Sequence, residues 1–212
     1  MITVWGEGRG FRVVWLLEEM GLHYRLRDVD LLKGVENDPE FLAINPAGFI
    51  PALTDGDVTM VESIAIMDYP TARHGPTVLA PEPDDPCFAL YRQFMVLGEA
   101  GLMMPSYIIS VSGGERPGNG GADVARRVLD SRLGLVRRQL MRTDYVAGEA
   151  FTAADISVVY ALEHAARHGV HGLDAPERDY VARCTGRAGY ARAMAACRAT
   201  REWVERLGVT SA

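Results

Sequence analysis

Glu62 and Ser63 are the residues best placed for chemistry, because they directly precede a helical pattern of apolar residues. The first N–H groups of a helix lack intrahelical partners, and the helix dipole adds about half a positive charge there. A carboxylate at this point would accept hydrogen bonds from the Ser63 hydroxyl and backbone N–H. Glu62 could meet an ammonium group. By itself the pair indicates only that Ser63 caps the helix, and a site for the zwitterion of an amino acid is the alternative.

A second candidate site is the turn that follows the first predicted strand, Trp5-Gly6-Glu7-Gly8-Arg9-Gly10. None of these residues carries a hydroxyl or a thiol. The backbone N–H groups of Arg9, Gly10 and Phe11 come at the start of the next predicted helix, which favours anions. The Arg9 guanidinium adds a permanent positive charge. We interpret the turn as an anion-stabilising site, and the alternative is that Arg9 forms a surface ion pair.

These residues need a scaffold, and the first third of the chain predicts a mixed α/β unit. Short β-branched or alternating runs indicate strands, and apolar residues at helical spacing indicate helices. An Asp55-Gly56-Asp57 turn predicts a hairpin. The elements expected are strands at 1–5, 24–29, 52–54 and 58–61, and helices at 11–20, 39–43 and from 62 to about 74.

The rest of the chain predicts helices only. A proline-rich stretch around 76–86 carries no periodic pattern and is typical of a linker. Beyond it the strand signals disappear, and helices are expected at 86–110, 122–142, 153–168 and, in pieces, 175–206. The chain therefore divides into an α/β domain at 1–76, a linker at 77–85 and an all-helical domain at 86–212.

Within the helical half, Phe151-Thr152-Ala153-Ala154-Asp155 has the spacing of a helix start. Thr152 is expected to cap the helix, and Asp155 to reach back to it in a capping box with an acid in place of Glu. We interpret this motif as structural and not as part of a functional site.

Charge and composition exclude several classes of function. The 212 residues contain 22 Lys and Arg against 28 Asp and Glu, a net charge of -6, so a nucleic-acid partner is not expected. No apolar run approaches the ~20 residues of a membrane span. The start of the chain shows no secretory signal. We therefore expect a cytoplasmic protein without a membrane partner.

The metal-binding side chains are too scattered for a metal site. Cys87, Cys184 and Cys197 are widely spaced and odd in number, which fits reduced thiols and not a disulfide framework or a zinc site. His164 and His168 share a helix face, but no carboxylate sits at a matching position. No metal is expected.

Several motifs together resemble the glutathione transferase superfamily, particularly its bacterial cytosolic members. NPAGFIPAL, a hairpin and then VESIAIMDY are similar to its glutathione-binding signature, and GRGFRVVWLLEEMGLHY is similar to its first turn and helix. AGEAFTAADISVVYALEHA resembles its buried capping motif, and YVARCTGRAGYARAMAAC its last helices. The resemblance implies a thioredoxin-like N-terminal domain followed by an all-helical domain.

The resemblance also implies how glutathione, as co-substrate, would bind. Pro51 stands where the family has a cis-proline, which turns the N–H and C=O of Ile50 toward the cysteinyl residue of glutathione. Glu62 and Ser63 stand where the family binds the γ-glutamyl group. The glycine carboxylate needs a donor from residues 33 to 45, and Lys33, Asn37 and Asn45 remain open alternatives.

The activating group is where this chain departs from the family. Most members ionise the glutathione thiol with a Tyr, Ser or Cys at the first turn, whereas Trp5 or Gly10 occupies that position here. We expect the helix start at Gly10 together with Arg9 to stabilise the thiolate. The absence of a cysteine disfavours thiol-disulfide chemistry. Conjugation to a small hydrophobic electrophile is the expected reaction, with a glutathione-dependent isomerase or dehalogenase, or a non-catalytic glutathione-binding protein, as alternatives.

The electrophile would lie between the turn and the first helix of the second domain. Apolar and aromatic side chains gather there, and methionines adapt to varied apolar ligands. Such a stripe also fits a core or the contact of a homodimer, which the resemblance implies. The candidates for this hydrophobic site are Trp5, Tyr91, Met95, Met103 and Tyr107.

Overall fold

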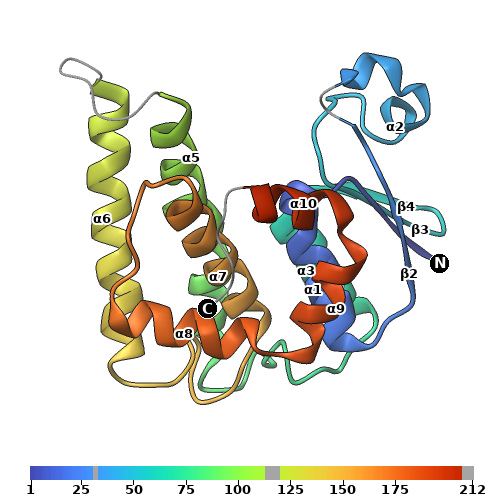
Figure 1. Cartoon of the computed structure of the whole chain (residues 1–212). Coiled ribbons are helices and arrows are strands. Elements are labelled where there is room, and N and C mark those ends of the chain that lie inside the picture. Colours follow the sequence, from blue (N-terminus) through green and yellow to red (C-terminus); the bar gives the residue numbers. More distant parts are fainter. Residues whose placement is uncertain (31–32, 113–119, 207–212) are drawn as a thin grey trace. The chain divides into compact units, whose positions relative to one another are not determined.

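The chain folds into two compact units, seen in a computed structural model that describes residues 1–30, 33–112 and 120–206, the last four as backbone only (Figure 1). The first unit contains Met1–Thr77 together with the C-terminal segment that starts at Arg187. The second unit contains Val78–Gly186. Each unit is described below by itself.

A four-stranded mixed sheet forms the centre of the first unit. Its strands are β1 (Ile2–Trp5), β2 (Tyr24–Arg27), β3 (Ala52–Asp55) and β4 (Val58–Val61). They lie in the order β2-β1-β3-β4, with β1 and β2 parallel and the other two pairings antiparallel. All four strands were predicted. The parallel β1–β2 pair requires the intervening helix as its crossover.

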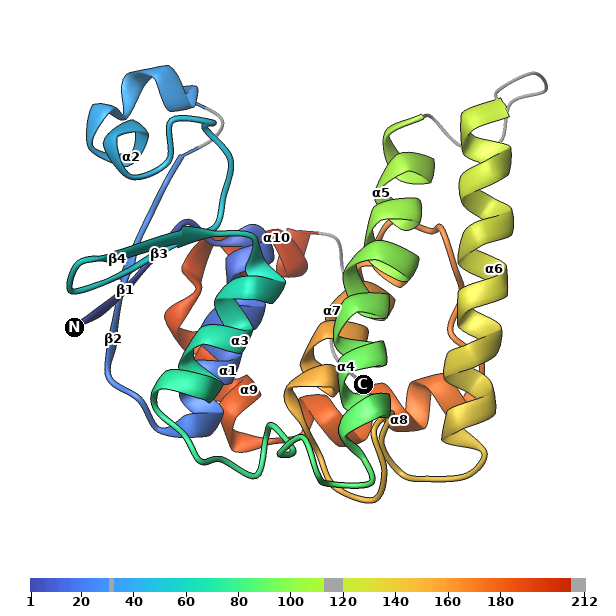
Figure 2. The same cartoon turned by 180° about the vertical axis from the view of Figure 1, so that it is seen from behind.

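Helices cover both faces of this sheet. Helices α1 (Phe11–Met20) and α3 (Ser63–Arg73) lie on one face, and α2 (Pro39–Ile44) lies on the other (Figure 2). A 3₁₀ turn, η1 (Gly8–Gly10), leads into α1, and another, η3 (Val35–Asn37), precedes α2. The predicted helix at 11–20 is confirmed at both ends, since Gly21 closes it in the left-handed conformation.

Two C-terminal helices, α9 (Ala188–Ala196) and α10 (Arg198–Arg206), belong to this first unit. Helix α9 runs beside α1, where Tyr190 packs edge-on against Trp15 with ring centroids 4.8 Å apart. Arg187 holds the Glu19 carboxylate through two nitrogens, at 2.9 and 2.8 Å. The compact units therefore divide the chain differently from the predicted domains at its C-terminal end.

The second unit is entirely helical in its described part. Its elements are α4 (Phe88–Val96), the π-helical η4 (Leu97–Met103), α5 (Met104–Val111), α6 (Gly120–Leu140), α7 (Ala153–Arg167) and α8 (Ala175–Thr185). The π-helical segment is where α7 comes close, because a Cβ at Gly98 would lie only 2.6 Å from the Ser157 backbone carbon. The Ser157 hydroxyl donates to the Met95 carbonyl at 2.8 Å.

The continuous helical stretch Phe88–Val111 corrects the expectation that no apolar run approaches the length of a membrane span. By length and composition it could cross a membrane, with a mean hydropathy of 1.5 over its best window. More than half of that window, 56%, is buried inside the protein. Buried apolar residues serve the packing of α4, η4 and α5 against α6 and α7, so the stretch is explained as a core helix.

The predicted link between Thr152 and Asp155 at the start of α7 is confirmed. The Asp155 carboxylate, which is fully buried, accepts from the Thr152 N–H at 2.7 Å and from its hydroxyl at 3.1 Å. It also accepts from the Val146 N–H at 3.0 Å and the Tyr180 hydroxyl at 2.8 Å. Burial raises the pKa of Asp155 to about 6, although these four donors oppose the rise.

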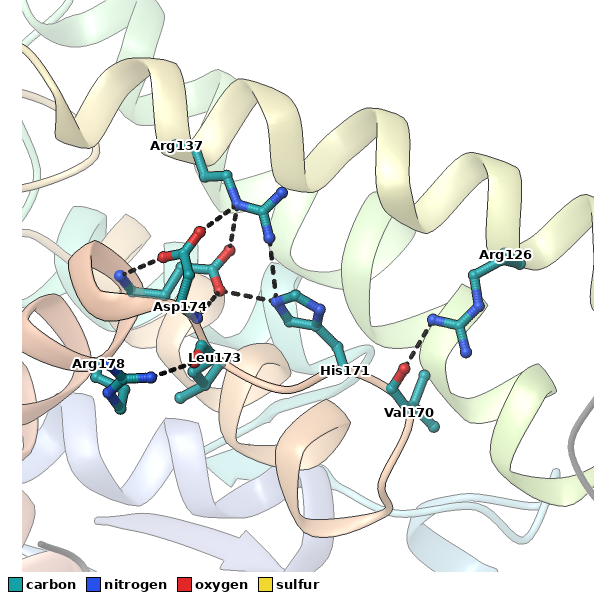
Figure 3. A network of polar contacts seen from close by, with 8 residues as sticks. Arg126, Arg137, Val170, His171, Leu173, Asp174 and Arg178 are labelled. Atoms are coloured by element: carbon teal, nitrogen blue, oxygen red, sulfur yellow. Dashed lines mark hydrogen bonds and ion pairs between the residues drawn. The ribbon is translucent and has the colours of Figure 1, made fainter.

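A second buried carboxylate, Glu177, ties the start of α8 to Arg137 of α6. Figure 3 labels its partners Arg137, His171 and Asp174. Glu177 accepts from the Asp174 N–H at 3.0 Å, and Asp174 in turn accepts from the Glu177 N–H at 3.0 Å. Arg137 of α6 reaches Glu177 at 3.0 Å and His171 reaches it at 2.7 Å. Despite burial, these contacts hold the pKa of Glu177 below its ordinary value, with the His171 hydrogen bond the largest lowering cause.

Neutralising Glu177 should therefore destabilise the protein in a pH-dependent way. A depressed pKa gives stability that is present above the unfolded value of about 4.3 and lost as the pH falls through the folded value. We expect Glu177→Gln to lower the free energy of unfolding by about 2 kcal/mol at pH 7, and by less at pH 4. Urea unfolding at both pH values measures this, with the exposed Glu149→Gln as control. An equal loss at both would contradict a role for the charge.

Candidate functional site

Strand pairing brings the three predicted site segments to one end of the sheet. Trp5 is opposite Ala52 across β1 and β3, and Ala52 is opposite Val61 across β3 and β4. Three segments therefore lie at this same end of the strands: the turn after Trp5, the Ile50–Pro51 segment before Ala52 and the Glu62–Ser63 pair after Val61. The first turn thereby becomes a neighbour of two segments that lie 40 or more residues further along the sequence.

The Ile50–Pro51 peptide bond is cis, as the resemblance implied. Within the described residues, the Ile50 N–H and C=O make no backbone hydrogen bond. The buried Asn45 stabilises the preceding turn through two hydrogen bonds. Its side-chain N–H donates to the Phe49 carbonyl at 2.6 Å, and its side-chain oxygen accepts from the Ala47 N–H at 3.2 Å. A rigid turn thus presents an unpaired donor and acceptor, and such a pair can bind an extended peptide.

Helix α3 begins at Ser63, with Glu62 at the N-cap position. Among the described residues, Glu62 is the only non-glycine residue with positive φ, at 69°. Such a conformation costs about 1–3 kcal/mol and is found mostly at functional sites. The Glu62 side chain is exposed and makes no cap hydrogen bond to the helix, although the residue occupies the N-cap position.

Ser63 is only 4% exposed, and no hydrogen bond to its hydroxyl is found in the part of the chain that the structure describes. The interpretation in which Ser63 merely caps the helix is wrong, because the residue lies one position inside it. The Ser63 hydroxyl and the start of α3 are therefore both available to a carboxylate.

Glycines let the first turn lie directly on Ile50 and Pro51. Gly6 has a φ of 83°, and a Cβ there would lie 2.4 Å from Ile50 Cγ2. A Cβ at Gly10 would lie 3.2 Å from Pro51 Cβ. Neither position leaves room for a larger residue without a shift, so this close approach explains why the turn is rich in glycine.

The prediction of free N–H donors at this turn is wrong for two of its three groups. The Gly10 N–H donates to the Glu7 carbonyl at 2.9 Å, and the Phe11 N–H donates to the Gly8 carbonyl. These two hydrogen bonds form η1, so the N–H groups of Gly10 and Phe11 are already paired within the turn. Arg9 is half-buried beside them and has interactions of its own.

Trp5 is a core residue and not part of a hydrophobic substrate site. Its side chain is 7% exposed, and the indole N–H donates to the Thr54 hydroxyl at 3.2 Å. The ring packs near Phe41 of α2, with centroids 6.5 Å apart, and the Arg27 guanidinium lies 5.5 Å from it. Trp5 is buried because its ring lies under α2, and the sequence pattern alone did not say whether it would be buried or exposed.

Three of the four hydrophobic-site candidates in the helical unit are also buried. Tyr91, Met95 and Met103 are no more than 2% exposed. Only Tyr107 is accessible, at 43%, because it lies on a different face of the long helical stretch. The exposed apolar residues of α5 recur at helical spacing and are Met104, Tyr107, Ile108 and Val111.

The remaining polar candidates do not converge on one point. Asn45 is engaged in its turn, Lys33 pairs with Asp30 at 3.3 Å, and Asn37 donates to the Lys33 carbonyl at 2.6 Å. Within the described ranges no group of three His, Cys, Asp or Glu side chains could hold a metal ion.

A cavity of about 430 Å³, which no motif in the sequence indicated, lies beside the turn and Ile50 within the first unit. Part of its wall is α10, at the opposite end of the chain. No local signal could have assigned α10 to this site, since the contact depends on the fold of the whole unit. The lining residues are Glu7, Gly8, Asp28, Val29, Asp30, Ile50, Arg198, Ala199, Thr200 and Glu202.

Known proteins similar to this chain carry one family name. Residues 2–70 match the family model of the glutathione S-transferase N-terminal domain. The chain is 35% identical to glutathione S-transferase 3 of Zea mays over 159 residues, which cover 68% of each chain. It is 28% identical to glutathione S-transferase 3 of Schizosaccharomyces pombe over 176 residues, 75% of this chain and 71% of that one.

Solved structures of similar fold cover nearly the whole chain. The apo form of a glutathione S-transferase III has a TM-score of 0.73 at 26% identity, covering 92% of this chain and 96% of that one. The transferase URE2P6 of Phanerochaete chrysosporium, in complex with oxidized glutathione, has a TM-score of 0.76 at 22% identity, covering 99% and 97%. The predicted fold, a thioredoxin-like domain plus a helical domain, is confirmed.

The contact between Gly6 and Ile50 generates a prediction. Gly6→Ala should lower the melting temperature and abolish retention on immobilised glutathione, because the added methyl displaces Ile50 and the backbone stays at positive φ. Gly56→Ala is the matched control, since its φ of 59° is also positive but nothing lies within 4 Å of its Cβ. Both effects are measured on the purified variants. If both variants lose the same stability and both still bind, the Gly6–Ile50 contact does not shape the site.

Proposed function

Because the chain belongs to the glutathione S-transferase family, we propose that it conjugates the glutathione thiolate to a small hydrophobic electrophile. The transferase class itself follows from the relatives, all named glutathione S-transferases. The observation that best supports glutathione as co-substrate is the set of unpaired polar groups around one end of the sheet: the Ile50 main chain, the Ser63 hydroxyl and the start of α3.

The γ-glutamyl group of glutathione would bind at Glu62 and Ser63. Its carboxylate would accept hydrogen bonds from the Ser63 hydroxyl and N–H, and its ammonium would meet the exposed Glu62 carboxylate. The positive φ of Glu62 supports this role, because a strained conformation that serves no capping bond is retained for another purpose.

The cysteinyl residue would pair with Ile50 in the manner of an added strand. Since the first turn packs on the Ile50 side chain through Gly6, the sulfur would lie close to that turn. In the conjugation of an aryl halide, the thiol proton goes to solvent, the sulfur–carbon bond forms and the halide leaves. Arg9 and Gly10 remain the proposed neighbours of the sulfur, Arg9 by its charge.

A non-catalytic glutathione-binding protein is the second candidate. It is favoured by the first turn, which has no hydroxyl or thiol and whose Gly10 and Phe11 N–H groups are already bonded. A glutathione-dependent isomerase or dehalogenase would use the same binding groups. Turnover of an aryl halide by the wild-type protein separates the enzyme from the binding protein.

We also propose that the protein is a cytoplasmic homodimer. Its three cysteines are free thiols, two of them buried, which suits a reducing compartment. The exposed apolar face of α5 would be covered by a partner subunit or by the electrophile.

The direct test of the proposed site is Ser63→Ala. A hydrogen bond to a charged group contributes about 1.5–3 kcal/mol, so calorimetry should show glutathione affinity reduced by about 10–100-fold. The partly exposed Ser110→Ala, on α5 of the helical unit, should bind as the wild type does. Unchanged affinity in a folded Ser63→Ala protein would remove the γ-glutamyl site from this proposal.

A further inference from the structure

The cavity beside Ile50 contains a group that the first turn lacks. Of its ten lining residues, only Thr200 carries a hydroxyl, and none carries a thiol. Within the described part of the chain this hydroxyl has no hydrogen-bond partner. Gly8 of the first turn and Ile50, with which the cysteinyl residue is proposed to pair, line the same cavity.

Glu7 fixes where Thr200 lies. Its carboxylate, 8% exposed, accepts from the Thr200 N–H at 2.6 Å and from the Ala199 N–H at 3.2 Å. Two N–H groups at the start of α10 are thus satisfied by a carboxylate from the first turn, an arrangement that also suits the helix dipole. Glu7 therefore holds the start of α10 against the same turn that faces Ile50.

We propose that Thr200 is a catalytic residue whose hydroxyl donates a hydrogen bond to the glutathione sulfur, with Glu7 as its positioning residue. The inference rests on the proposed function, and assigns the activating hydroxyl to the C-terminal helix instead of the first turn. The thiol proton goes to solvent, and Thr200 keeps its own proton while donating to the thiolate.

The charges around the cavity would oppose a thiolate, and such a donor would offset them. Its wall carries the carboxylates of Glu7, Asp28, Asp30 and Glu202 against the single guanidinium of Arg198. Glu202 lies 3.7 Å from Arg198, and Lys33 lies 3.3 Å from Asp30, so part of this charge is compensated. Arg9 in the first turn, the buried Arg12 at the start of α1 and the exposed Glu62 beside α3 are further charged groups of the segments that form the proposed glutathione site. The excess of carboxylates disfavours a thiolate, and a hydroxyl in contact with the sulfur offsets that effect.

The test compares Thr200→Val and Thr200→Ser with the wild type. Bound thiolate is followed by its ultraviolet absorbance during a pH titration with glutathione, and affinity is followed by calorimetry. We expect the valine variant to contain about tenfold less thiolate at neutral pH, one pKa unit, with affinity within about twofold of the wild type. The serine variant should restore the thiolate, because it restores the donor.

Two controls separate the outcomes. Thr200→Ala also removes the hydroxyl without adding atoms, so it replaces the valine variant if valine perturbs the fold. The exposed Thr59→Val should behave as the wild type. If glutathione binds but the thiolate fraction is unchanged in the valine and alanine variants, Thr200 is not the donor. If the wild type binds no glutathione, the proposed function fails, and the assignment of Thr200 fails with it.

Discussion

The pairing of β3 with both of its neighbours is the constraint on which the site depends. Because Ala52 is opposite Trp5 on one side and Val61 on the other, the turn, the cis-proline segment and the start of α3 must leave the sheet together. A shift of one residue in this register would turn Leu53 to the wrong face and separate the three segments. The positions of the binding groups therefore follow from the strand register, which the burial of Leu53 and its neighbours fixes.

Ion pairs and hydrogen bonds over long sequence distances hold the last helices on the first unit. Glu19 holds Arg187, Glu18 holds Arg192 at 2.8 Å, and Glu7 holds the start of α10. All three carboxylates come from the first turn and α1, and all three bind the last helices. Helix α10 thereby becomes part of the cavity wall beside Ile50. The lining of the cavity depends on these contacts as much as on the sheet.

Local patterns in the sequence were sufficient to predict the strands, most helix limits and the Thr152–Asp155 cap, because these depend on neighbours in the chain. The cis bond at Pro51 and the roles of Glu62 and Ser63 came from resemblance. Burial was less predictable: helical spacing marks an apolar stripe in α4 and η4 but cannot say which side of it faces the core. The place of α10 was not predictable, since its partners lie more than 190 residues away.

The central claim is that unpaired main-chain groups at Ile50 and the start of α3 bind glutathione together. Titration of the ¹⁵N-labelled protein with glutathione, followed by backbone amide chemical shifts, tests it most directly. If both groups bind glutathione, the Ile50 and Ser63 amides shift with the same apparent dissociation constant, and they shift more than amides elsewhere in the sheet. Glutathione binding that leaves both amides unchanged would contradict it.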